Sequence, residues 1–490
     1  MSKLFYFLNK KNKILFYTII IISLLAFFFN IASSLLVVPL FLSIVDIDYL
    51  NNVPFNFLFT FLKIDLKNNF ESALFIVLGV IILSNIIVFL SNILKIFYQN
   101  LLILEIKNRY FNLITNLNFK NYVDLSRTDL NKDVTIEIER FVSAYLIPAN
   151  TLVTKIILLA VVFAIVSISY PIASLLCLVT LLFMNFAIYR TIRKKVKNKS
   201  IEYNRLISSQ SHHVSSLLSQ FKIIYIYGLE LNYNQIFQKI TSDLKSTINY
   251  FGIIKLIPRL FIEVIVFSTL IYTIYYFYSR GSEGVEVIAL LAFAGICFIK
   301  LIPVIQDVFF NITLIKSNKE IFKYLKSKIE FFENNQKFIA SKKDPLLKFE
   351  QKISLKNICY EIKNKPIFKN VTLELNKNKI IGIAGPSGSG KTTLVDIICG
   401  LLDPTSGHIF IDDIKLENKN KSTYQNSISY CSYSSLLIND SIKNNILFFQ
   451  EENEEKLSKI IKLCNLDAFI KNLKFGINTK VGDDSSLIRA

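Results

Sequence analysis

The stretch GPSGSGKTT at 385–393 has the residue types and the spacing of a phosphate-binding loop. It fits the pattern G-x-x-x-x-G-K-[ST], in which glycines let backbone N–H groups approach phosphate oxygens. The run NKIIGIAG before the loop predicts a buried strand, and KTTLVDIICGLL after it predicts a helix. Because this strand–loop–helix context is the one that the pattern requires, the sequence predicts a nucleotide site.

Each polar group of this loop has an expected role. Lys391 is expected on the β- and γ-phosphates, and the Thr392 hydroxyl is expected to ligate Mg²⁺. The N-terminus of the following helix adds a dipole that favours an anion. The loop residues predicted to bind nucleotide are Gly385, Ser387, Gly388, Ser389, Gly390, Lys391, Thr392 and Thr393.

The remainder of the chain is too apolar for an ordinary soluble protein. Hydrophobic residues make up 52% of the 490 residues, and they gather in 14–310, before the loop. The net charge is +19, but the basic residues form clusters beside apolar runs, as in RTIRKKVKNK at 190–199. This placement is typical of membrane proteins, so we expect a membrane-lipid environment and no nucleic-acid partner.

The apolar runs predict an all-α membrane domain in 1–325, because a spanning helix needs about 20 mostly apolar residues. Two long segments between the runs keep helical periodicity, which predicts helices that extend into the cytoplasm. The polar stretch 326–346 is expected to be a linker, and 347–490 an incomplete α/β P-loop NTPase domain. Six helices are expected, at roughly 14–45, 72–105, 134–169, 171–228, 240–279 and 285–325.

Charge and cysteine spacing complete this topology. Lys and Arg are abundant in 95–140 and 190–259, and they are sparse in the short loops on the opposite side. The positive-inside rule therefore places both termini in the cytoplasm of a multi-pass protein of the cytoplasmic (inner) membrane. The six cysteines form no C-x-x-C pair, so no metal-binding spacing is present.

Further segments carry a family resemblance. They are KFEQKISLKNICYEIKNKPIFKNVTLEL at 348–375, GLLDPTSGHIFIDD at 400–413 and SIKNNILF at 441–448. Together with the loop and the apolar runs, they resemble an ATP-binding cassette (ABC) exporter half-transporter. The resemblance implies ATP and Mg²⁺ as cofactors, Tyr360 stacking on adenine, and a second half-transporter, identical or different, as a dimer partner.

The same resemblance implies ATP-dependent export of a substrate that the sequence does not identify. NFKNYVDLSRTDLN at 118–131 and YGLELNYNQIF at 227–237 resemble the two cytoplasmic coupling segments of the family. In the family these segments dock on the nucleotide domain and carry its motion to the membrane helices.

Two departures from the family pattern stand out. The position of the glutamine that contacts Mg²⁺ and the attacking water is Tyr433 here, and a phenol has no amide carbonyl for a metal. The 490 residues also stop at the start of the signature motif, before the catalytic glutamate, the acidic strand and the switch histidine. We therefore assign no catalytic residue and expect no ATP hydrolysis from this polypeptide alone. The alternative is a non-transporting ATP-binding membrane subunit, or an inactive remnant of a truncated transporter gene.

Charged residues in or near the apolar runs are candidates for the substrate path, because ionisable groups inside a membrane are usually functional. They are Lys155, Arg259, Glu263, Lys300 and Asp307. Lys155 is the leading candidate. Lys300 and Asp307 are expected near the inner interface, where side chains can snorkel, and Arg259 and Glu263 can pair at i,i+4 spacing.

Overall fold

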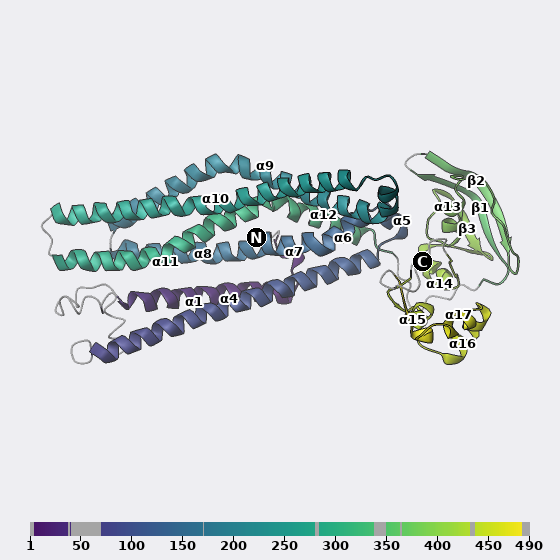
Figure 1. Ribbon diagram of the computed structural model, residues 1–490, viewed down its shortest axis with the longest axis horizontal. Coiled ribbons are helices and arrows are strands. Elements are labelled where there is room, and N and C mark those ends of the chain that lie inside the picture. Colours follow the sequence, from purple (N-terminus) through teal and green to yellow (C-terminus); the bar gives the residue numbers. More distant parts are fainter. Residues whose placement is uncertain are drawn as a thin grey trace. The chain divides into compact units, whose positions relative to one another are not determined.

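The computed structural model describes residues 4–37, 40, 70–169, 171–279, 284–337, 349–362, 365–431 and 437–482. The chain separates into two compact units, Met1–Lys337 and Phe338–Ala490. Figure 1 draws both units.

The first unit is a bundle of long helices that run side by side (Figure 1). Helix α9 has 56 residues with a kink at Gln220, and its path is about 84 Å long, well beyond the roughly 30 Å core of a bilayer. A helix of this length extends beyond the apolar layer of a membrane, as expected from the sequence. The short helix η1 (Leu4–Phe7) precedes the bundle, whose long members are α1 (Lys10–Leu35), α4 (Phe70–Thr115), α8 (Ile147–Ser169), α9 (Pro171–Ile226), α10 (Glu230–Ser279) and α11 (Gly284–Ser317).

Three helical stretches within the described part of the chain are long and apolar enough to cross a membrane: Lys10–Leu35, Phe70–Thr115 and Arg127–Ala164. Their outward faces are apolar, with Phe75, Phe89 and Ile82 more than half exposed. Such faces suit a lipid environment, because a soluble protein rarely exposes a contiguous apolar surface of this size. The helical membrane fold is thus as predicted, while the count of six spanning helices stays a prediction.

The third expected helix, 134–169, is not a single regular α-helix. Its path passes through two π-helical segments, η3 (Asp133–Glu137) and η4 (Val142–Leu146). Pro148 follows η4 closely and has no N–H to donate to the preceding turn, which gives a local reason for the wider turn there. The short helices of this region are α5 (Phe119–Val123), α6 (Arg127–Lys132) and α7 (Ile138–Phe141).

The prediction of a linker over 326–346 is wrong for its first nine residues. Helix α12 spans Lys319–Asn334 after a break at Ser317–Asn318. The charged composition of this stretch hid an apolar face with helical spacing, whose members are buried: Ile321, Phe322, Leu325, Ile329 and Phe332. Residues 338–346 of the expected linker lie outside the described residues.

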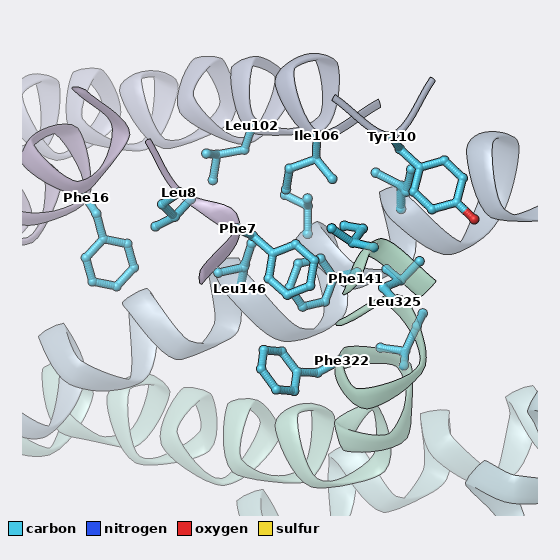
Figure 2. Close-up of a cluster of buried hydrophobic side chains, with 14 of the residues drawn as sticks. Phe7, Leu8, Phe16, Leu102, Ile106, Tyr110, Phe141, Leu146, Phe322 and Leu325 are labelled. Atoms are coloured by element: carbon cyan, nitrogen blue, oxygen red, sulfur yellow. The ribbon is translucent and has the colours of Figure 1, made fainter. Parts of the chain in front are cut away.

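Helix α12 packs into the largest apolar cluster found among the described residues of the first unit (Figure 2). The Phe7 ring packs against both Phe141 and Phe322, with centroids 4.6 and 5.7 Å away. From this cluster, Tyr110 and Tyr324 donate hydrogen bonds of 2.7 and 3.1 Å to Oδ2 of the buried Asp133 at the start of η3. The N-terminal segment, α4, α7 and α12 are therefore joined by one core.

The second unit contains an antiparallel sheet of order β2-β1-β3-β4. Its strands are β1 (Lys352–Ile362), β2 (Lys365–Asn376), β3 (Ser406–Ile411) and β4 (Ile414–Lys415). Strands β5 (Asp440–Ser441) and β6 (Lys480–Val481) form a separate pair. The helices are α13 (Lys391–Ile398), α14 (Asn418–Gln425), α15 (Ile442–Leu447), α16 (Glu454–Leu463) and α17 (Asp467–Lys471), with a short η5 (Gly476–Asn478).

The expected buried strand at NKIIGIAG is not formed. Residues 379–386 have no ladder partner among the described strands, and Ile380 is fully exposed, at 105%. A strand that precedes a phosphate loop takes its hydrogen bonds from neighbouring strands of the sheet. Within the described residues no strand pairs with it, and its apolar side chains are exposed.

Candidate functional site

The phosphate loop ends in a left-handed turn that only glycine accommodates well. Gly390 caps the N-terminus of α13 with φ 90° and ψ 10°. A Cβ at this position would lie 2.7 Å from Ile367 Cγ2 and 2.8 Å from Phe368 Cζ. Gly390 is therefore required both by its backbone conformation and by the close approach of strand β2.

Lys391 lies folded over the loop. Its ammonium group donates hydrogen bonds of 2.8 Å to the backbone carbonyls of Gly385 and Pro386. The Leu394 N–H donates to the Gly390 carbonyl at 2.9 Å and forms the first helical bond of α13. The earlier N–H groups of a helix have no partners within it, so this end presents backbone donors and an ammonium group together.

The hydroxyl groups of the loop are accessible. Ser387, Ser389 and Thr392 are exposed and Thr393 is half-buried. Among the described residues no group of three His, Cys, Asp or Glu side chains could hold a metal ion. Mg²⁺ commonly binds through few protein ligands together with phosphate oxygens and water, and the exposed Thr392 hydroxyl fits that pattern.

Tyr360 lies close to the loop, but its ring is buried and not accessible to a ligand. It faces Phe368 in the β1–β2 ladder, and Phe368 is also the residue that closes on Gly390. Tyr360 is only 5% exposed, so its ring offers little surface for stacking in this conformation. The adenine contact stays a prediction, and it requires the ring to become exposed. Tyr433, at the glutamine position, lies outside the described residues.

Sequence reasoning missed the contacts at the other end of α13. The Tyr424 hydroxyl donates to the Ile398 carbonyl at 2.8 Å, and Gln425 Nε2 donates to the Gly400 carbonyl at 2.9 Å. The sequence feature that could have indicated these contacts is the tyrosine in the otherwise polar run NKNKSTYQ. An aromatic side chain tends to be buried, and a buried tyrosine hydroxyl usually has a hydrogen-bond partner.

In the first unit, Lys155 is buried, at 6% exposure, and forms an ion pair of 3.0 Å with Asp307. Its ammonium group also lies 4.0 Å from the ring centroid of Phe27, and Lys95 approaches the same ring at 5.8 Å. Lys300 donates a 2.8 Å hydrogen bond to an asparagine of α1. The structure thus brings the predicted Lys155 and Asp307 together, with further lysines nearby. The side chain of Arg259 lies outside the described residues.

The turn between α9 and α10 exposes apolar side chains. Gly228 ends the turn of α9 in a left-handed conformation, with φ 62°, and the Leu229 N–H donates to the Ile224 carbonyl at 3.0 Å. Three residues around the turn are 65–73% exposed: Ile226, Tyr227 and Leu231. This turn falls at the start of the second predicted coupling segment. The first contains α5, capped by the Asn118 side chain.

Comparisons with known proteins point to ABC transporters. The profile of the ABC transporter family matches residues 368–479. The chain is 23% identical to an export ATP-binding/permease protein of Rickettsia typhi over 84% of this chain and 72% of that protein. It is also 23% identical to a heterocyst differentiation ATP-binding protein of Nostoc, over 77% of this chain and 62% of that protein.

A lipid A-core flippase of Syntrophus aciditrophicus is 29% identical, but only over 28% of this chain and 23% of its own length. Among solved structures, a bacterial Atm1-family ABC exporter with ATP bound matches with a TM-score of 0.75 and 14% identity, over 95% of this chain and 80% of the exporter.

Proposed function

Since the chain belongs to the ABC exporters as a half-transporter, we propose that it binds MgATP at 385–393 and couples this binding to substrate movement across a membrane. The observation that carries the proposal is the geometry of the loop. Gly390 turns the chain into α13, and Lys391 rests on two loop carbonyls within reach of any phosphate held there. Backbone N–H groups of the α13 N-terminus supply the remaining donors for the phosphates.

When Mg²⁺ is bound, it neutralises phosphate charge, and Thr392 is the loop residue that would hold it. The chain's own groups do the rest: Lys391 exchanges its two carbonyl acceptors for phosphate oxygens, and the hydroxyls of Ser387 and Ser389 are exposed beside it. Charge-assisted hydrogen bonds of this kind are roughly twice as strong as neutral ones. The exchange is therefore favourable once a phosphate enters.

We propose that the chain functions as one half of a dimer in the cytoplasmic membrane, with both termini in the cytoplasm. The asymmetry of Lys and Arg supports this orientation. The exposed apolar turn around Tyr227 supports a docking role for the coupling segment 227–237, because an apolar tip at the end of a polar helical extension is costly unless it is covered.

For the substrate, we propose that Lys155 lines the path and that the transported molecule carries an anionic group. Lys95 and Lys155 both approach the Phe27 ring, Lys300 of α11 donates to Asn30, three residues after Phe27 on α1, and Asp307 is the counter-ion of Lys155. Asp307 is itself 48% exposed in its side chain, so a ligand anion can compete with it for Lys155. A relative named as a lipid A-core flippase is in line with a lipid-linked anion.

The direct test of nucleotide binding uses the whole chain in lipid nanodiscs and an azido-ATP photoprobe with Mg²⁺. Parent protein should be labelled, and Lys391→Ala should lose most of this labelling. Lys379→Ala is the matched control, because Lys379 is an exposed lysine shortly before the loop. Equal labelling of parent and Lys391→Ala would refute the proposed site.

A further inference from the structure

Helix α13 is held at both ends by other elements. It has only 8 residues, and its N-terminal end is the phosphate loop, where Gly390 lies against strand β2. At the C-terminal end, α14 approaches with two side-chain donors. The Tyr424 hydroxyl donates to the Ile398 carbonyl at 2.8 Å, and Gln425 Nε2 donates to the Gly400 carbonyl at 2.9 Å.

The bond from Tyr424 satisfies an acceptor that the helix itself leaves open, and the bond from Gln425 holds the turn that follows the helix at Gly400. The last carbonyls of a helix have no partner within it and need donors from elsewhere. At this end some are met by backbone groups, such as the Leu401 N–H on the Asp396 carbonyl at 2.8 Å. Ile398 and Gly400 instead receive side chains from α14, and Lys421 adds a third tie through a 2.7 Å ion pair with Asp403.

The Tyr424 side chain lies in the interior of the second unit and not on its surface. It is 2% exposed, and burial raises the pKa of its hydroxyl above the ordinary value of 10.0, so the group stays a hydrogen-bond donor even in alkaline solution. Hydrogen-bond donors at the C-terminal end of a helix also place partial positive charge next to the negative end of the helix dipole, which is favourable. The direction and position of α13 are thereby fixed at the end opposite the phosphates.

Resting on the proposed function, we infer that Tyr424 and Gln425 are positioning residues for phosphate binding. They hold the far end of α13, so that Lys391 and the first N–H groups of the helix meet the β- and γ-phosphates in register. A short, rigid helix transmits any tilt at one end to the other. Loss of the two donors therefore misplaces the phosphate donors without removing any of them.

The test measures the dissociation constant of MgATP for the whole chain in nanodiscs, for Tyr424→Phe, Gln425→Met and the double variant. Each change keeps size and removes donors, so each should weaken MgATP binding about three- to tenfold, and the double variant more. Gln425→Lys restores a donor and should recover part of the affinity. Thr423→Val is the control, because in the described part of the chain the Thr423 hydroxyl donates to the Asn420 carbonyl of its own helix, at 2.7 Å, and not to α13.

Binding is measured well below the unfolding midpoint of each variant. At that temperature nearly every molecule is folded, so a merely structural role leaves the dissociation constant unchanged, whereas a positioning role raises it. Parental affinity in the double variant, with Lys391→Ala still defective, would overturn the inference and leave the proposed function standing. Parental affinity in Lys391→Ala would instead overturn the proposed function.

Discussion

Replacing Gly390 with alanine is expected to weaken nucleotide binding by adding a single methyl group. The residue has φ 90°, and its added Cβ would lie 2.7 Å from Ile367 Cγ2 and 2.8 Å from Phe368 Cζ. Cβ contacts below 3.0 Å force a neighbour to move, and here the neighbours are a branch methyl and a ring in strand β2. The left-handed backbone adds a penalty of its own.

Gly388 offers a matched control within the same loop. It also has a positive φ, 82°, but a Cβ there would meet no atom within 4 Å. Alanine at Gly388 therefore incurs only the left-handed penalty, about 1–2 kcal/mol. Alanine at Gly390 incurs the same penalty and an overpacking cost of about 1–3 kcal/mol.

The difference between the two variants should appear in affinity. The binding-competent loop is disfavoured by the overpacking cost, and the apparent dissociation constant rises as its population falls. A cost of about 1–3 kcal/mol corresponds to a factor of about 5 to 150 between Gly390→Ala and Gly388→Ala. Equilibrium binding of a fluorescent ATP analogue to the whole chain measures this ratio. Equal affinities, or a weaker Gly388→Ala, would refute the packing argument.

Three further predictions address the first unit. In a cysteine-free background, a cysteine at Gly284 should react with an impermeant thiol reagent from outside and one at Asn198 only after permeabilisation; outside labelling at Asn198 would reverse the orientation. Lys155→Met should reduce the number of anionic lipids retained in native mass spectrometry, while Asp307→Asn should not, because it removes the competing anion. Burial and a hydrogen bond to a glutamate of α12 raise the pKa of Tyr6 from 10.0 to about 12. Its stabilising contribution is therefore present below pH 10 and lost as the pH rises to about 12; the fall of the unfolding temperature between pH 10 and about 12 should be larger in the parent than in Tyr6→Phe, and an equal fall would contradict this assignment.

The parts predicted well from the sequence are those specified by local chemistry. The loop 385–393 opens α13 as expected, because its glycines and lysine act within a few residues of one another. Charge-free apolar runs likewise predicted the long helices. The linker prediction failed at 326–334 because a charged composition concealed the apolar spacing of Ile329 and Phe332.

Other features depend on contacts between distant segments. The burial of Tyr360 follows from the partner strand β2, and the exposure of Ile380 follows from the lack of a neighbouring strand among the described residues. The bonds from Tyr424 to the end of α13 join residues 26 positions apart. No local pattern specifies such pairings, since side-chain donors reach carbonyls only after the chain has folded.

The central claim is that nucleotide at the loop is coupled to the membrane helices. Hydrogen–deuterium exchange on the whole chain in nanodiscs tests it most directly, through peptides covering 223–237 between α9 and α10. MgATP should change the exchange rate of these peptides in the parent and leave them unchanged in Lys391→Ala. Unchanged exchange in a parent sample that has bound MgATP, or the same change in Lys391→Ala, would contradict the account.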